Sequence, residues 1–96
     1  MMSKEWKFEK YTALAVDVMF ALDTPNYDEQ EARRIFKNFI SFLRMVFQHN
    51  IPIEEQNRQA NHEISILQDI LETGGSLRDQ SEFIKASQRR LIEYFM

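Results

Sequence analysis

The sequence predicts an all-α protein, and three observations support that fold class. Apolar residues recur at spacings of three and four, the period of a helix. No segment alternates apolar and polar residues with the period of two that a strand requires. The two prolines and two glycines stand only where one helix gives way to the next. We expect one helical domain over residues 1–96, either an antiparallel four-helix bundle or two helical hairpins completed by dimerisation.

The first helix is expected over residues 4–22, and Ser3 is placed to cap it. It must end before Pro25, which lacks an amide hydrogen and forces the preceding residue out of helical geometry. The sequence therefore predicts a long first helix followed by a short turn.

The second helix is expected to begin near Tyr27 and to end at Asn50. Asn26 followed by Glu29 has the spacing of a capping box, in which two side chains bond to the first turn. Asparagine readily adopts the left-handed conformation that ends many helices, so Asn50 is a suitable stop.

The third and fourth helices are separated by Gly74 and Gly75, which end the third near Glu72. Pro52 suits the first turn of the third helix. The fourth is expected from residue 76 to near residue 96, with an acidic capping box made by its first and fourth residues, Ser76 and Asp79. Its apolar stripe continues to Phe95, which predicts that the end of the chain docks on the core.

The second helix has more apolar face than one buried contact requires. At about 100° per residue, its apolar residues except Met45 lie within an arc of roughly 160°, against about 100° for an ordinary surface helix. The residues in this arc are Ala32, Ile35, Phe36, Phe39, Ile40, Phe42, Leu43, Val46 and Phe47. This helix is expected to be central, buried by several neighbours or by another chain.

The first helix has apolar residues on two opposite sides. One side carries Phe8, Tyr11, Leu14, Ala15, Val18, Met19 and Leu22, and the other carries Trp6, Ala13, Val16 and Phe20. The second stripe is either covered by a deeper placement of the helix and by the chain termini, or it is an interface. Large aromatic rings are typical interface anchors. We predict a protein partner or a second copy there, contacting Trp6, Ala13, Val16 and Phe20, with Phe42 and Met45 at the margins of the second helix.

Four basic residues of the second helix support an alternative, a small regulator that binds nucleic acid. Arg33, Arg34, Lys37 and Arg44 would contact phosphates. Acidic residues are mixed among them, and the chain has a net charge of −3, so a solvated face is the favoured interpretation.

Composition and motifs favour binding over catalysis. Apolar residues make up 44% and charged residues 28% of the chain, which is typical of a globular domain. The absence of cysteine excludes disulfides, thiolate metal sites and a cysteine nucleophile. Neither His49 nor His62 has a partner at metal-ligand spacing; the residue three before His62 is Gln59, not the glutamate of a di-iron motif.

We therefore expect a small interaction module of the adaptor, inhibitor or immunity type, without enzymatic activity, metal or cofactor. It is expected to self-associate through its apolar helix faces and to reside in the cytoplasm. The longest apolar stretch, residues 13–22, is about ten residues long and contains Asp17, so no membrane partner is expected.

Overall fold

A computed structural model of the protein describes residues 3–49, 54–73 and 75–96. Regular structure in these ranges is entirely helical, which confirms the all-α fold class. The helices are α1 (Lys4–Asp23), α2 (Glu29–His49) and α3 (Glu54–Glu72), followed by a last helical segment. That segment consists of the 3-10 helix η1 (Leu77–Gln80), α4 (Ser81–Leu91) and the 3-10 helix η2 (Ile92–Phe95). The features predicted at Asn50, Pro52 and Gly74 lie outside the described residues.

The start of α1 is capped as predicted. The Ser3 hydroxyl oxygen accepts a hydrogen bond from the backbone N–H of Trp6 at 3.0 Å, so one of the free amide groups of the first turn has a partner. The helix continues one residue beyond the predicted end, to Asp23.

The predicted start of α2 is wrong by two residues. The helix begins at Glu29, and Asp28 is its capping residue. One carboxylate oxygen of Asp28 accepts from the N–H groups of Gln30 and Glu31, at 3.0 and 3.3 Å. Asn26 lies in the preceding turn, too early in the chain to reach these donors.

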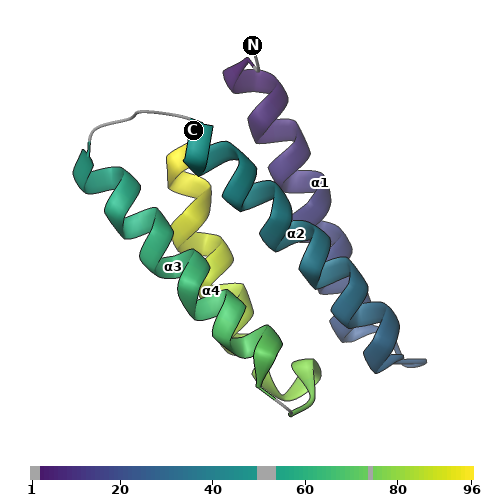
Figure 1. Cartoon of the computed structure of the whole chain (residues 1–96). Coiled ribbons are helices and arrows are strands. Elements are labelled where there is room, and N and C mark those ends of the chain that lie inside the picture. The colour runs from purple at the N-terminus through teal and green to yellow at the C-terminus, as the bar shows by residue number, and fades with distance from the viewer. Residues whose placement is uncertain (1–2, 50–53, 74) are drawn as a thin grey trace.

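Helix α2 is the central element, as its wide apolar arc predicted. It packs along both α1 and α3, and the last helical segment contacts α1, α2 and α3 (Figure 1). The buried residues of α2 are Ala32, Phe36, Phe39, Ile40, Phe42, Leu43, Val46 and Phe47. Helices of the same chain therefore bury the apolar arc, and no second copy is needed to cover it.

The C-terminal end of the chain docks on the core through Phe95. This ring is buried and stacks on Tyr11 of α1, with ring centroids 4.4 Å apart. It also contacts Phe42 and Phe47 of α2, at centroid distances of 6.1 and 5.6 Å. The predicted docking is confirmed for Phe95, whereas Met96 is exposed.

Two hydrogen bonds hold α1 against α4 next to this aromatic cluster. The buried Tyr11 hydroxyl donates to the backbone carbonyl of Gln88 at 2.7 Å, and the Gln88 side-chain amide donates to the Ala15 carbonyl at 3.4 Å. Burial raises the pKa of the Tyr11 phenol above its usual value near 10, because the charged phenolate would lose its hydration. The inner side of α1 is thereby fixed on the core.

The structure corrects the prediction for Phe8. This residue shares the apolar stripe of Tyr11, Val18 and Leu22, which we call the inner stripe of α1, but it is exposed. It lies beside the chain end, in a shallow depression lined by Phe95 and Met96. This partial cover leaves the Phe8 ring in contact with solvent, whereas Tyr11, about one turn further along the same stripe, is buried. No helix in the described ranges has both the length and the apolar character to cross a membrane.

Candidate interaction surface

The second apolar stripe of α1 lies on the exposed side of the helix. Phe20 is 73% exposed, Val16 is 44% exposed and Trp6 is 42% exposed, and Ala13 lies exposed between them. We refer to the exposed residues Trp6, Glu9, Lys10, Ala13, Val16, Asp17 and Phe20 as the outer face of α1. Because the described residues leave the apolar members of this face open to solvent, α1 is not buried from both sides.

Trp6 is held in place from beneath by Phe42. The two rings meet edge to face, with centroids 6.1 Å apart and planes at 61°. Phe42 is itself only 6% exposed. This corrects the predicted role of Phe42 at the margin of an interface: it is a core residue that supports Trp6. Met45, one turn further along α2, is exposed as a surface contact would require.

A groove of about 670 Å³ adjoins the outer face, between α1 and α4. Tyr11 and Gln88 lie along it. Its other lining residues on α1 include Val16, Met19 and Phe20, and those on the last helical segment include Lys85, Arg89 and Ile92. Val16 and Phe20 therefore belong to both the groove and the outer face.

Charged residues mark one end of the groove. Lys85 lies 3.6 Å from the Asp23 carboxylate and 3.8 Å from that of Glu82. These exposed pairs contribute little stability, at most about 1 kcal/mol each. The groove is suited to binding an apolar side chain, with polar groups at its edge to orient what enters.

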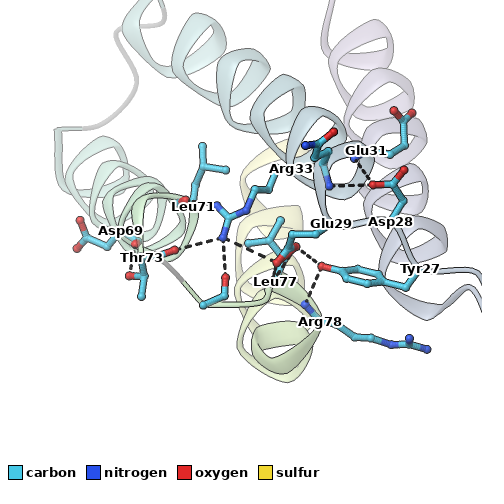
Figure 2. A network of polar contacts seen from close by, with 12 residues as sticks. Tyr27, Asp28, Glu29, Glu31, Arg33, Asp69, Leu71, Thr73, Leu77 and Arg78 are labelled. Carbon is cyan, nitrogen blue, oxygen red and sulfur yellow. Dashed lines mark hydrogen bonds and ion pairs between the residues drawn. The ribbon is translucent and has the colours of Figure 1, made fainter.

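Arg33 has a structural role that was not expected when the basic strip of α2 (Arg33, Arg34, Lys37 and Arg44) was considered as a nucleic-acid-binding surface. Its guanidinium donates to the carbonyls of Leu71, Thr73 and Gly75, at 2.5, 3.2 and 2.6 Å, and lies 3.9 Å from the Glu29 carboxylate (Figure 2). These carbonyls are at and just beyond the end of α3, where backbone acceptors lack helical partners. Arg33 therefore caps α3 and is not an open phosphate ligand.

The rest of the basic strip is also mostly engaged within the chain. Arg34 pairs with Glu31 through two hydrogen bonds, and Arg44 donates to the Gln68 side chain at 3.4 Å. Lys37 is exposed. Arg34, Lys37 and Arg44 are thus exposed, whereas Arg33 is turned toward the end of α3, so the four groups are not presented together as that alternative expected.

Glu29 caps the last helical segment in place of the predicted Ser76–Asp79 box. The Ser76 side chain makes no capping hydrogen bond. Instead, the Leu77 N–H donates to both oxygens of Glu29, at 3.0 and 3.3 Å, and the Tyr27 hydroxyl also bonds to this carboxylate (Figure 2). A residue of α2 therefore fixes the turn that leads into α4.

A polar cluster joins α3 to α4 on a different side of the molecule. The Glu63 carboxylate accepts from Arg90 Nε at 2.6 Å and from the Ser87 hydroxyl at 2.9 Å. The hydrogen bond from Arg90 holds the pKa of Glu63 below its ordinary value. His62 lies beside this cluster and is exposed; within the described ranges, no three histidine or acidic side chains gather as metal ligands would.

Sequence reasoning gave no partner-binding role to Lys10 and Asp17, two of the three charged members of the outer face. Both side chains are exposed, and they are seven residues apart on α1. Trp6, Ala13 and Phe20 are separated by the same interval. This shared seven-residue spacing is visible in the sequence, but only the structure shows that α1 keeps all five residues on its open side.

Comparison of the chain with protein-family models, with curated proteins and with solved structures gave no match.

Proposed function

We propose that the protein is a small protein–protein interaction module, of the adaptor, inhibitor or immunity type, that acts without catalysis and self-associates through the outer face of α1. The observation that carries this proposal is the exposure of Phe20, at 73%, in line with Trp6 and Val16. The inner side of α1 already supplies Tyr11 and Leu22 to the core, so the outer apolar residues are surplus to folding.

The physical argument is the cost of leaving these rings in water. Full burial of a phenylalanine side chain is worth about 1.5–3 kcal/mol relative to exposure. Phe20 is three-quarters exposed, so most of that free energy is available to an association. Aromatic rings also bring large contact area at low entropic cost, and they dominate the energetics of protein interfaces.

The arrangement of the helices supports a preformed binding surface. Tyr11 and Gln88 tie α1 to α4, and the Trp6 ring rests on Phe42. An antiparallel bundle in which these contacts persist would present the outer face of α1 with little ordering on binding. Such preorganisation lowers the entropic cost of association.

The test is the solution mass measured by light scattering after size exclusion, over a series of protein concentrations. Wild-type protein should shift from monomer towards dimer as concentration rises, and Phe20→Asp should remain monomeric with unchanged helicity by circular dichroism. The matched control is Phe83→Asp, because Phe83 is similarly exposed, at 67%, but belongs to α4. It should associate like wild type.

Two outcomes would contradict the proposal. A wild-type chain that stays monomeric at every concentration has no self-association to explain. If Phe20→Asp loses its helical signal, Phe20 is needed for folding and its exposure does not mark an interface.

A further inference from the structure

We infer that the partner of the outer face is a second copy of this chain, bound with the two α1 helices antiparallel and with a two-fold axis passing between the two Ala13 residues. The inference rests on the proposed function and adds the geometry of the dimer. Its evidence is the self-complementary order of apolar and charged side chains along α1.

The apolar residues are symmetric about Ala13. Trp6 lies seven residues before it and Phe20 lies seven residues after it, about 10 Å away along the helix in each direction. Seven residues fall about 20° short of two full turns, so all three stay on one narrow stripe. A two-fold axis at Ala13 exchanges the ends of the stripe and places each Trp6 against Phe20 of the second copy.

The small side chain at the centre allows the helices to approach closely. Ala13 is exposed, with a methyl group where Trp6 and Phe20 have rings. Helix pairs pack with their axes about 8–10 Å apart, and small residues at the crossing give the shorter distances. The rings at the two ends then bracket the close approach on either side.

The charges on one flank of the stripe fit antiparallel pairing. Lys10 and Asp17 lie three residues before and four residues after Ala13, on the same flank of the stripe. Neither is engaged in an ion pair with the residues that the structure describes. In the antiparallel dimer each Lys10 faces Asp17 of the second copy, which makes two attractive contacts. In a parallel two-fold pair this flank would lie on opposite sides of the contact in the two copies, so Lys10 would lie nearest Glu9 of the second copy and Asp17 would have no basic partner.

The contact is small, so the dimer is expected to be weak. Stable complexes commonly bury about 800 Å² on each partner, and a contact made by one face of one helix provides less. Association should therefore depend on concentration, and it should weaken in high salt because exposed charges are screened.

Exchange of the two charges gives the decisive experiment, measured by sedimentation equilibrium at low ionic strength. Lys10→Glu alone places two carboxylates at each charged contact of the dimer, and Asp17→Lys alone places two ammonium groups there. Each variant should therefore dimerise about tenfold more weakly than wild type. An equimolar mixture of the two should dimerise as wild type does, because both contacts in the mixed dimer are then attractive. The double variant should also regain wild-type association.

A cysteine introduced at the axis tests the same geometry independently. The chain has no cysteine, so one added residue gives an unambiguous product. Ala13→Cys should form an intermolecular disulfide on mild oxidation, since the two copies of this position meet at the axis. Thr12→Cys is the control: this position is also exposed but lies about 100° away around α1, and the variant should stay reduced under the same conditions.

The outcomes separate this inference from the proposed function. If wild type dimerises and Phe20→Asp abolishes the dimer, but the charge variants and their mixture all behave as wild type, the antiparallel geometry is wrong and the interaction function stands. Failure of the mixture to regain association, or disulfide formation by Thr12→Cys and not by Ala13→Cys, would also overturn the geometry. A wild-type protein that is strictly monomeric would contradict both the proposed self-association and the antiparallel geometry.

Discussion

Replacement of Arg33 by alanine should destabilise the protein far more than the same change at the next residue. The Arg33 guanidinium donates to three backbone carbonyls at and beyond the end of α3. Hydrogen bonds from charged donors are worth about 1.5–3 kcal/mol when buried. Arg33 is half-buried and water can replace part of each bond, so we discount each to somewhat under 1 kcal/mol and expect a total loss of about 2 kcal/mol.

The matched control is Arg34→Ala. Arg34 is exposed and, among the described residues, pairs with Glu31 on its own helix; solvent screens this pair, so its loss should change the stability little. Urea unfolding followed by circular dichroism measures both free energies of unfolding. In a domain of this size, a loss of about 2 kcal/mol corresponds to a fall of about 8–16 °C in the melting temperature.

Arg33→Lys supplies a second check, because an ammonium group is compact and does not reproduce the planar fork of the guanidinium. It should recover only part of the lost stability. Equal destabilisation by Arg33→Ala and Arg34→Ala would refute the capping role, and full stability of Arg33→Lys would show that charge alone is sufficient.

Three further predictions concern contacts between helices. Phe95→Ala should lower the free energy of unfolding by about 3–5 kcal/mol, whereas deletion of the exposed Met96 should change it by less than about 0.5 kcal/mol; comparable losses in urea unfolding would contradict the docking of Phe95. Glu63 has a lowered pKa, so its contribution is present above its unfolded pKa near 4.5 and is lost as the pH falls through the folded value. In Glu63→Gln, the free energy of unfolding should therefore fall less steeply as the pH is lowered. An unchanged fall would show that the pair between Glu63 and Arg90 does not cause it. Tyr11 has a raised pKa, so its contribution to the free energy of unfolding is present below about pH 10 and is lost above it. Tyr11→Phe should cost about 1 kcal/mol at neutral pH and remove the loss of stability at alkaline pH. Thermal melts of the variant that still show this alkaline loss would disprove the prediction.

The sequence by itself determined the helices and the identity of the central one. The Ser3 cap and the apolar arc of α2 are local patterns, formed between residues three or four apart, so the chain order alone reveals them. The pair between Glu29 and Arg33 follows the same rule. The second apolar stripe of α1 was also visible as a pattern.

Only the tertiary structure decided which groups meet across the chain. Arg33 caps a helix end about 40 residues away, and Glu29 caps the helical turn at Leu77, 48 residues away. Phe42 belongs to the core and Phe8 does not, although both lie on apolar stripes of their helices. A periodic pattern shows that a side is apolar, but not how far neighbouring helices extend over it. Burial and long-range capping depend on packing between helices, and that packing is fixed only when the whole chain is folded.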